Sequence, residues 1–293
     1  MTTAAALATA LSETMPGISP DVYGIADFRA VAELAYASAG IVLEDGKAML
    51  VYSRWAPLVR ESGCSTFSAY IDYIKDNPAE QTRAVGALTT NHTFFYREPH
   101  HFEHLLRESR PPLVHRLQEG GAARVWSAGC SSGEETWSIV TTLLGEDAPL
   151  GRRLATANLR VLASDIAQHA LKKAAAATYP TADIEAVPAP LRKAWTKETN
   201  GMTTLSDVAR GLVRFRTLNL HGAWPMRGRF DIIFCRNVMI YFDNPTKERL
   251  ISRFAEALVP GGFLYIGHSE RVTGPAAAQL LPVGPTIYQR TAA

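Results

Sequence analysis

The amino-acid sequence predicts an α/β protein: an all-α N-terminal domain, followed by a Rossmann-like domain with a small inserted antiparallel β-subdomain. Three observations lead to this prediction. The chain has 293 residues, which is comfortable for two domains. Before residue 88, apolar side chains recur only at helical spacing. From about Arg124 onward, short apolar runs alternate with helical stretches, as in parallel sheets that helices cover on both faces.

The N-terminal part of the chain predicts helices. Phe28, Val31 and Ala35 form one apolar stripe at helical spacing, and no alternation typical of strands is present. The alanine-rich start lacks the basic region of a signal peptide. We therefore expect a flexible N-terminus over residues 1–20 and a helical domain over residues 21–88.

The remaining residues, 89–293, predict the Rossmann-like domain. Each apolar run is short enough for a buried strand and is separated from the next by a helical stretch. The predicted strands are residues 124–128, 159–164, 230–234 and 263–267.

One region interrupts this alternation, and we expect it to form the inserted β-subdomain, at about residues 178–217. It contains prolines and an Asn200-Gly201 pair that suits a tight hairpin. Its last stretch, Leu212 to Thr217, alternates apolar and basic residues, as a strand does.

Composition and charge exclude several classes of protein. Apolar residues make up 47% of the chain and charged residues 20%, which is typical of a globular protein and not of a disordered one. The formal net charge is only +2, so we expect no nucleic-acid partner bound through bulk charge. The longest charge-free stretch, residues 272–289, is broken by glycines and prolines and cannot span a bilayer.

Three scattered cysteines, Cys64, Cys130 and Cys235, lack the spacing of a zinc site or a disulfide framework. Such a set is typical of reduced thiols inside the cell. We expect a cytoplasmic monomer that does not insert into a membrane.

The strongest local signal is the segment from Val125 to Glu135, where an apolar strand leads through small residues into a helix. In doubly wound sheets a nucleotide-like ligand binds at this turn. The loop lacks the GxGxxG pattern, and Glu134 and Glu135 at the helix start would repel a pyrophosphate. A cationic ligand without phosphate, such as S-adenosylmethionine, fits instead. The alternative is that both acids merely favour the helix dipole.

Polar residues follow two other predicted strands. A carboxylate at Asp165 can accept hydrogen bonds from both ribose hydroxyls of an adenosine group. It can also cap the helix that follows, and both roles are compatible. Arg236, Asn237 and Tyr241 follow residues 230–234 and are expected at the same edge of the sheet, although Tyr241 also suits a core position.

Three histidines lie close together in the sequence, at His100, His101 and His104. No cysteine or carboxylate converges with them in the pattern of a metal site, so we expect surface or supporting roles and no metal. No nucleophilic triad or phosphate-binding loop is assignable.

Together and in this order, these segments resemble the chemotaxis receptor methyltransferase family, the CheR-type protein-glutamate O-methyltransferases. The resemblance extends from about Tyr23 to Gln289. One departure is Tyr96, where the family usually carries a second Phe before the arginine. The segments that carry the resemblance are Asn91–Arg97, Trp126–Glu135, Ala163–Ile166, Asn219–Leu220, Phe234–Phe242 and Pro260–Glu270.

The resemblance implies a class I S-adenosylmethionine methyltransferase domain preceded by a helical domain. Arg97 and Tyr241 match the family positions thought to orient the substrate carboxylate. The family's cofactor contacts correspond here to Asn91, Thr93, Arg97, Glu134, Asp165, Asn219, Leu220, Arg236 and Asn237.

The implied reaction transfers a methyl group from S-adenosylmethionine to glutamate side chains of chemoreceptor-like proteins, giving glutamyl methyl esters and S-adenosylhomocysteine. A glutamate with a pKa of about 4.3 is already ionised at neutral pH, so no general base is required. The enzyme's task is then positioning: Arg97 can clamp the carboxylate and the Tyr241 hydroxyl can share that work.

Two alternatives remain open. The first is a methyltransferase for a small carboxylate, although a small substrate needs no helical docking domain. The second is a non-catalytic module that senses S-adenosylmethionine. Intact Arg97, Glu134, Asp165 and Tyr241 argue against it.

The implied partner is the cytoplasmic helical region of a chemoreceptor-like protein. Lys47 and Arg54 lie seven residues apart in an acid-free stretch, so they share a face if that stretch is helical. Our hypothesis is that they dock the receptor; the alternative is an ordinary solvated face. Some family members use the β-subdomain to hold a receptor's C-terminal peptide. Residues 195–220 lack the Gly-rich loop associated with that mode, so we expect recognition independent of such a tether.

Overall fold

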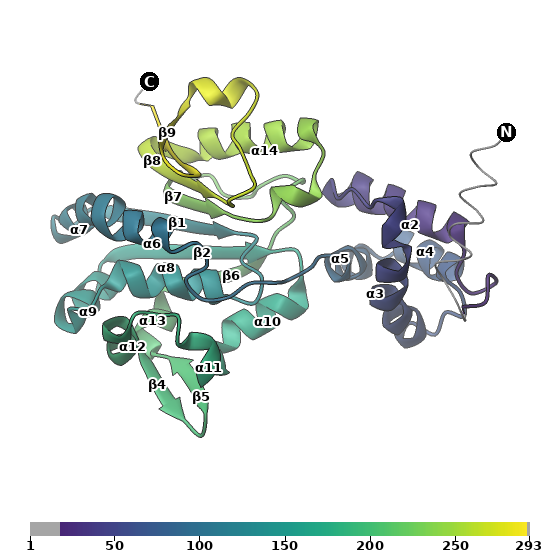
Figure 1. Cartoon of the computed structure of the whole chain (residues 1–293), viewed down its shortest axis with the longest axis horizontal. Helices are drawn as coiled ribbons and strands as arrows, with labels where there is room; N and C mark the ends of the chain where they lie inside the picture. Colours follow the sequence, from purple (N-terminus) through teal and green to yellow (C-terminus); the bar gives the residue numbers. More distant parts are fainter. Residues whose placement is uncertain (1–17, 292–293) are drawn as a thin grey trace. The chain divides into compact units, whose positions relative to one another are not determined.

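The computed structural model describes residues 18–291, which divide into two compact units (Figure 1). The first unit comprises the chain up to Thr90 together with Tyr241–Asp243. The second comprises Asn91–Ile240 and the chain from Asn244 onward. Most of the predicted flexible N-terminus, residues 1–17, lies outside the described residues.

The first unit is all helical, as predicted. Trp55 is fully buried in its core, and the indole N–H donates to the carbonyl of Ala84 over 2.9 Å. The buried Tyr23 hydroxyl likewise donates to the carbonyl of Ala48 over 3.0 Å. The helices are α2 (Ile25–Ala39), α3 (Ala48–Glu61), α4 (Phe67–Lys75) and α5 (Pro78–Ala87), with the short 3₁₀ helix η1 (Asp45–Lys47) before α3.

A segment from much later in the chain completes the first unit. Phe242 forms an antiparallel bridge with Ile41, and the Val42 N–H donates to the carbonyl of Tyr241 over 2.9 Å. The Tyr36 hydroxyl donates to the carboxylate of Asp243 over 2.8 Å. Residues 241–243 are therefore held by the helical unit, although Tyr241 is the last residue of the 3₁₀ helix η3 (Met239–Tyr241), whose first two residues belong to the second unit.

The second unit contains the predicted Rossmann-like sheet. Within the described residues this sheet has seven strands in the order β6-β2-β1-β7-β8-β10-β9. The first five are mutually parallel, and β10 runs antiparallel to both β8 and β9. Their bounds are β1 (Ala122–Ala128), β2 (Asn158–Asp165), β6 (Val213–Thr217), β7 (Phe230–Cys235), β8 (Leu258–Ile266), β9 (Leu280–Gly284) and β10 (Ile287–Arg290).

Aromatic contacts show which helices cover each face of this sheet (Figure 1). On one face Trp126 of β1 contacts Phe254 of α14 (Asn244–Ala257), with ring centroids 5.4 Å apart. On the opposite face Phe215 of β6 contacts Trp137 of α8 (Glu134–Leu144), at 5.7 Å. Helices α9 (Ala148–Thr156), α10 (Gln168–Ala176) and α13 (Asp207–Leu212) pack with α8, β2 and β6, and η4 (Pro275–Ala278) precedes β9.

A helical stretch with an internal π-helical segment leads into β1. Helix α6 (Pro99–His104) continues through the π-helix η2 (Leu105–Ser109) into α7 (Arg110–Gln118). Pro111 and Pro112 lie in the first turn of α7 and lack the N–H groups that ordinary helical bonding would use. The wider hydrogen-bond spacing of η2 just before them is the expected local accommodation.

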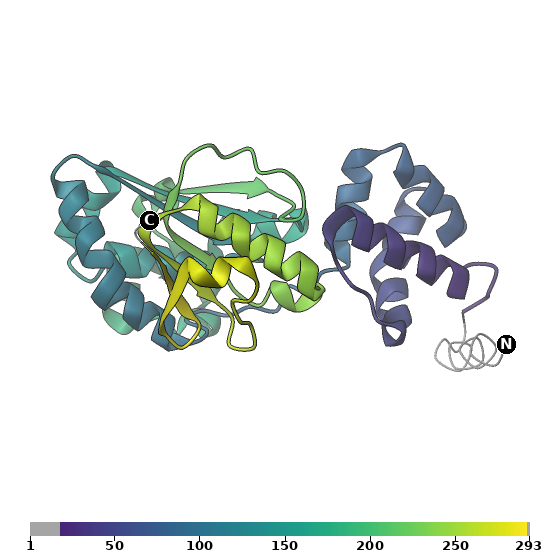
Figure 2. The ribbon, with the colours of Figure 1, turned by 90° about the horizontal axis from the view of Figure 1, so that it is seen from above.

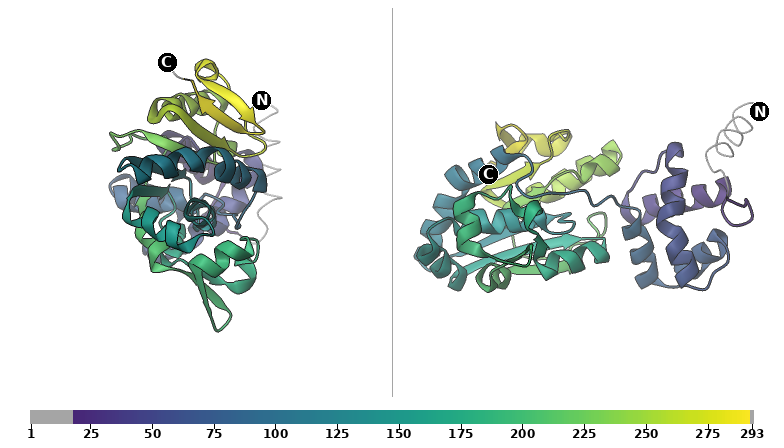
Figure 3. Two further views of the ribbon diagram at one scale, coloured as in Figure 1. Left: turned by 90° about the vertical axis from the view of Figure 1, so that its left-hand side faces the viewer. Right: turned by 60° about the horizontal axis from the view of Figure 1, so that its bottom comes forward.

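The inserted antiparallel β-subdomain is present, as a three-stranded sheet in the order β3-β5-β4 (Figures 1 and 3). Asn200 and Gly201 join β4 to β5 with φ values of 52° and 74°. Two consecutive positive φ values are typical of the type I′ hairpin that this pair predicts. The elements are β3 (Thr178–Pro180), α11 (Thr181–Ile184), α12 (Ala189–Trp195), β4 (Thr196–Thr199) and β5 (Met202–Leu205).

The expectation for Leu212 to Thr217 is wrong in one respect. Strand β6 does not belong to the β-subdomain, because it pairs in parallel with β2 at the edge of the large sheet, Val213 beside Val161 and Thr217 beside Asp165. Its alternation arises because Val213 and Phe215 face the helices while the arginines face solvent. The same pattern suits an edge strand of either sheet.

Two further properties concern the described residues as a group. No helix within residues 18–291 is long and apolar enough to cross a membrane. The three cysteines are free thiols, and burial raises the pKa of Cys130 and Cys235 well above its usual range. Both buried thiols are therefore expected to be unreactive.

Two glycines give a matched test of this backbone. Gly201→Ala forces a Cβ onto a residue with φ of 74°, and we expect a loss of about 1 kcal/mol in the free energy of unfolding. Gly211→Ala lies in α13 at ordinary φ, and we expect a gain of about 0.5–1 kcal/mol. Neither added Cβ would have a neighbouring atom within 4 Å in the part of the chain that the structure describes. Urea unfolding of both variants should therefore shift in opposite directions; shifts of the same sign would contradict this account.

Candidate cofactor and active site

The sheet order brings the predicted site residues to one edge. Strands β6, β2, β1 and β7 are neighbours, and their carboxyl ends lead to Asn219, Asp165, Gly129 and Arg236. Ligands in doubly wound sheets bind outside these carboxyl ends. The four segments predicted from the sequence therefore meet where the fold places a ligand.

The loop between β1 and α8 is shaped by left-handed backbone. Gly129, Ser131 and Gly133 have φ values of 80°, 50° and 98°. A Cβ on Gly133 would lie 2.7 Å from the Ala174 Cβ, so glycine is required where this loop passes α10. Helix α8 begins at Glu134, as predicted.

Asp165 ties this loop to the end of β2. One carboxylate oxygen accepts from the Ser131 N–H over 2.7 Å and the other from the Ala167 N–H over 2.8 Å. Burial raises the pKa of Asp165 above its ordinary value, and these backbone N–H groups partly offset the rise. Helix α10 begins at Gln168, so Asp165 is not its N-cap, contrary to the expectation. These two hydrogen bonds use only part of the carboxylate's capacity, so its remaining lone pairs can accept hydrogen bonds from a ligand.

Glu134 is buried beneath the loop. Its carboxylate accepts from the Ser132 hydroxyl over 2.7 Å and lies 3.3 Å from the ammonium of Lys173 on α10. The carboxylate is thus oriented by the protein before any ligand contact.

Asn91 and Thr93 lie in the segment leading into α6. The Asn91 carbonyl accepts from the Ser131 hydroxyl over 3.1 Å, which places this segment beside the loop after β1. The side-chain oxygen of Asn91 is buried and has no hydrogen-bond partner among the described residues. A buried acceptor without a partner is costly, so this oxygen is a position where a ligand N–H or O–H would be satisfied.

Arg236 is buried between two carboxylates. Its guanidinium lies 3.3 Å from Glu98 and 3.4 Å from Glu135, and its N–H also donates to the carbonyl of Arg97. Burial raises the pKa of Glu135 although Arg236 opposes the rise. Burial would also raise the pKa of Glu98, but Arg236 and His268 hold it below its ordinary value.

The backbone of Arg97 is fixed by its neighbours, while its guanidinium forms no ion pair with a carboxylate of the described chain. The flanking residues Tyr96 and Glu98 both have left-handed φ, 54° and 59°, which fixes the course of the chain around Arg97. The guanidinium donates to the carbonyl of His92 over 3.2 Å and lies over the ring of Phe94. Among the described residues, no carboxylate pairs with it.

Glu270 joins the turns after β7 and β8. Its carboxylate accepts from the backbone N–H groups of Asn237, Met239 and Gly267, over 3.2, 2.8 and 2.6 Å. Asn237 has a φ of 59°, and a Cβ on Gly267 would lie 2.6 Å from the side-chain nitrogen of Asn237 and 2.8 Å from its backbone nitrogen. Asn237 is therefore fixed at the strand end.

The remaining predicted cofactor residues lie after β6 or beside Asn91. The Asn219 side-chain oxygen accepts from the His221 N–H over 3.0 Å, and Leu220 is buried. The Leu218 N–H donates to the carbonyl of Asp165 over 3.0 Å, which links this turn to β2. Thr93 is half-buried.

Three predicted residues belong to the first unit. The Tyr241 hydroxyl donates to the carbonyl of Thr90 over 3.1 Å, and its role beside Arg97 stays a prediction. Lys47 is exposed in η1, whereas the half-buried Arg54 lies in α3, which begins at Ala48. The chain from Lys47 to Arg54 is thus helical, first 3₁₀ and then α, and a shared docking face of the two cations stays a prediction.

The histidines differ from expectation because a carboxylate does converge on two of them. Glu98, His100 and His101 each offer one potential ligand atom within 4.8 Å of the others. Glu98 is nevertheless paired with Arg236, whose positive charge opposes a cation there. The third histidine, His104, instead contacts the Tyr265 hydroxyl at 2.9 Å.

Four residues at this site escaped the sequence prediction in their present roles: Glu98, Glu135, Ser131 and Glu270. The sequence predicts a role for Glu135 at the start of its helix, but its partner Arg236 lies 101 residues away in the sequence. Glu270 belongs to a segment of the resemblance without an assigned function. Local pattern carries no signal for such long-range pairs.

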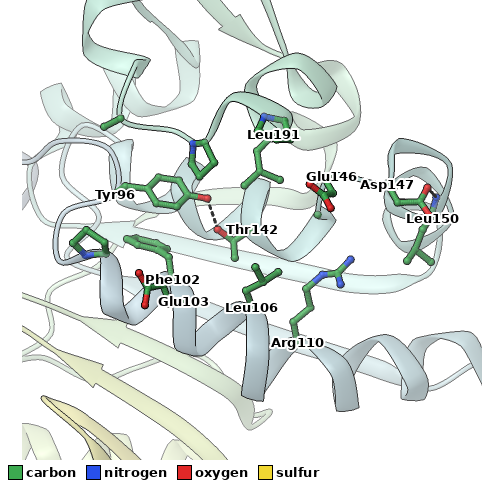
Figure 4. A pocket seen from close by; sticks show the side chains of 15 residues that line it. Tyr96, Phe102, Glu103, Leu106, Arg110, Thr142, Glu146, Asp147, Leu150 and Leu191 are labelled. Atoms are coloured by element: carbon green, nitrogen blue, oxygen red, sulfur yellow. Dashed lines mark hydrogen bonds between the residues drawn. The ribbon is translucent and has the colours of Figure 1, made fainter.

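A separate cavity of about 580 Å³ lies between α6–α7, the α8–α9 connection and α12 (Figure 4). Tyr96 lines it, and its hydroxyl lies 2.6 Å from the hydroxyl of Thr142. None of the predicted cofactor residues lines this cavity. The chain thus accommodates Tyr96, its departure from the usual Phe, by giving the extra hydroxyl a partner away from the site.

Comparison with known proteins assigns the family. Residues 91–283 match the model for the S-adenosylmethionine-binding domain of CheR methyltransferases, and residues 26–89 match the model for their all-alpha domain. The chain belongs to the CheR methyltransferase family. The predicted family, fold class and cofactor are thereby confirmed.

Individual relatives cover most of this CheR family chain. It is 40% identical to a Rhizobium etli protein named "Probable chemotaxis protein methyltransferase", over 88% of this chain and 97% of the relative. It is also 40% identical to chemotaxis protein methyltransferase 2 of Pseudomonas aeruginosa, over 89% and 92% of the two chains. The chemotaxis protein methyltransferase of Escherichia coli is 37% identical over 84% of each chain.

The residues of this CheR methyltransferase fit S-adenosylmethionine on their own chemistry. Buried Glu134, Glu135 and Asp165 favour a ligand with cationic groups over one with phosphates. Asp165 keeps lone pairs for hydroxyl donors, and the Asn91 oxygen lacks a partner within the described chain. These groups provide acceptors for the ligand's donors.

Acid sensitivity should arise from His101. Burial, with Arg236 nearby, lowers its pKa to about 3, so the folded protein keeps it neutral while the unfolded chain protonates it near pH 6.5. The unfolded state therefore binds the extra proton, and stability is lost as pH falls from about 6.5 toward 3. We expect His101→Gln to make the midpoint of urea unfolding depend less on pH between pH 7 and pH 5. An unchanged pH slope would contradict this assignment; the exposed His115→Gln is the matched control.

Proposed function

We propose that this protein transfers the methyl group of S-adenosylmethionine to glutamate side chains of a chemoreceptor-like protein in the cytoplasm, giving glutamyl methyl esters. The observation that carries the proposal is the state of Arg97. Its guanidinium has no carboxylate partner within residues 18–291, while its backbone carbonyl is fixed by Arg236 at the strand ends. A planar cation held in this way suits bidentate binding of a substrate carboxylate.

The cofactor is proposed to lie across the carboxyl ends of β6, β2, β1 and β7. Asp165 would accept from ribose hydroxyls, Asn91 from a donor of the ligand, and Glu134 from its ammonium group. When bound, S-adenosylmethionine supplies an activated methyl group on its sulfonium. The further proposed contacts are Thr93, Arg97, Asn219, Leu220, Arg236 and Asn237.

The protein's own catalytic task is proposed to be orientation. Arg97 would hold one glutamate carboxylate, and the Tyr241 hydroxyl would share that work, so that the attacking oxygen keeps its lone pair free. No general base is needed, because a glutamate is ionised at neutral pH.

Docking through the helical unit is proposed for Lys47 and Arg54. Their charges suit an acidic helical substrate, and reversing both to Glu should raise the KM for the receptor. The domain bounds proposed are 21–88 for this docking unit and 89–293 for the catalytic unit.

The decisive experiment incubates the protein with methyl-labelled S-adenosylmethionine and a purified chemoreceptor cytoplasmic domain. We expect label that base releases as methanol, the signature of a glutamyl methyl ester. Base-stable label, or label on small carboxylates only, would refute the proposal.

Asp165→Ala should weaken S-adenosylhomocysteine binding. Ribose hydroxyls lose their acceptor, at a cost of roughly 1–3 kcal/mol, which is about fivefold to 150-fold in the dissociation constant. Calorimetric titration measures this change, with the exposed Asp207→Ala as the control. A folded Asp165→Ala protein with unchanged affinity removes Asp165 from the site.

Arg97 and Tyr241 should separate binding from turnover. Tyr241→Phe is expected to lower kcat with S-adenosylhomocysteine affinity nearly intact, because it removes only a hydroxyl. Arg97→Ala is expected to reduce both kcat and the affinity for S-adenosylhomocysteine, because Arg97 is also a proposed cofactor contact. Steady-state kinetics and calorimetry test both variants against Tyr288→Phe. Full kcat in Tyr241→Phe would exclude that hydroxyl from positioning.

A further inference from the structure

Four arginines project from one face of the large sheet near its edge. Arg124 of β1 lies beside Arg160 of β2 in the parallel register. On the edge strand β6, Arg214 lies beside Leu162 and Arg216 beside Ser164. Because side chains alternate along strands, these four share a face. We call Arg124, Arg160, Arg214 and Arg216 the arginine face.

Aromatic contacts identify that face independently. Trp126, two residues after Arg124, contacts Trp224 and Phe254 on it. Phe215, which lies between Arg214 and Arg216 on β6, contacts Trp137 on the opposite face.

The connection that follows β6 contains no helix that could cover the arginine face. Residues 218–229 form an irregular loop between β6 and β7 (Figure 2). Arg160, Arg214 and Arg216 are exposed, and Arg124 is half-buried.

The guanidinium groups of the arginine face have no carboxylate partner within the described residues. The guanidinium groups of Arg160, Arg214 and Arg216 donate only to backbone carbonyls, and that of Arg124 to backbone carbonyls and to Asn158. The Arg124 backbone N–H donates to the carboxylate of Asp231 over 2.7 Å. Residues 212–230, which include Arg214 and Arg216 of this face, also contain Arg227 and Arg229 and have no acidic residue. A guanidinium has five N–H donors, so most of the donors on this face remain open to a ligand.

Protection of the sheet edge does not account for this arrangement. Charged side chains on an edge strand discourage pairing with other chains, which could explain Arg214 and Arg216 on β6. Arg160 and Arg124 lie on β2 and β1, one and two strands inside the edge. Four like charges on one face also repel one another, a cost that an acidic partner would remove.

We propose that the arginine face binds an acidic surface of the methyl-accepting protein, an inference that rests on the proposed function. A protein that presents glutamates for methylation presents carboxylates, which guanidinium groups bind bidentately. The arginine face also leads to the proposed site, because Arg216 lies beside Ser164 and the next residue of β2 is Asp165. Acidic side chains along this face would bring a neighbouring glutamate to the strand ends.

The test uses the full chain and a purified cytoplasmic fragment of a chemoreceptor encoded in the same genome. The variant Arg214→Glu/Arg216→Glu reverses two charges, and Arg152→Glu/Arg153→Glu is the control. Arg152 and Arg153 are exposed on α9, which packs with α8, and no carboxylate pairs with them among the described residues. Direct binding of the fragment and methyl transfer into it are measured separately, with S-adenosylhomocysteine affinity as the check on the site.

We expect Arg214→Glu/Arg216→Glu to raise the fragment's Kd and KM at low salt by at least about threefold and to flatten their salt dependence. The kcat at saturating fragment and the S-adenosylhomocysteine affinity should stay unchanged, and the control should change neither Kd nor KM. Arg214→Gln/Arg216→Gln provides a milder variant if the reversal unfolds the edge strand, and it should shift Kd in the same direction.

Three outcomes of the measurements with the fragment overturn the proposal: an equal effect of the control, an unchanged Kd in both β6 variants, or no binding of the fragment by the wild type. A DNA duplex or phosphatidylglycerol vesicles are tested in parallel. Loss of their binding in the β6 variants with fragment binding intact assigns the face to phosphates and also overturns it. If the fragment binds through Arg214 and Arg216 without being methylated, the proposed function fails while this surface stands.

Discussion

The site depends on one buried guanidinium. Arg236 lies between the carboxylates of Glu98 and Glu135 and donates to the carbonyl of Arg97. These contacts join the end of β7, the start of α8 and the segment before α6, which no strand pairing within residues 18–291 connects. Burying three charges is costly, and a set like this persists because removing any one member leaves another uncompensated. Its consequence here is positional: Arg97 is presented with its side chain unpaired by any carboxylate of the described chain.

Around that cation the site is rich in buried acid, and the protein holds each acid differently. Backbone N–H groups hold Asp165, a hydroxyl and a lysine hold Glu134, and a serine and Arg236 hold Glu135. A phosphate ligand would meet repulsion from three directions, whereas a ligand with sulfonium and ammonium groups would not. The charge of the site therefore favours a cationic cofactor without phosphate, and the loop after β1 also lacks the GxGxxG pattern of dinucleotide-binding proteins.

Local pattern was sufficient for much of the fold. The strand, loop and helix from Ala122 to Leu144 and the hairpin at Asn200-Gly201 were predictable because periodicity and positive-φ residues act within a few residues. The sheet to which β6 belongs was not predictable, since alternation marks an exposed strand without naming its partner. Glu98 and Glu135 were missed for the same reason, as their shared partner Arg236 is far away in sequence.

Net charge is the clearest case in which composition conceals arrangement. A balance of +2 predicts no binding of polyanions by bulk charge. It does not report that residues 212–230 carry four arginines without an acid, or that strand register brings Arg160 and Arg124 to the same face. Buried acids gather at the strand ends and unpaired cations on the adjoining sheet face. The acids suit a cationic cofactor, and the arginines are the surface that we propose binds an acidic protein substrate.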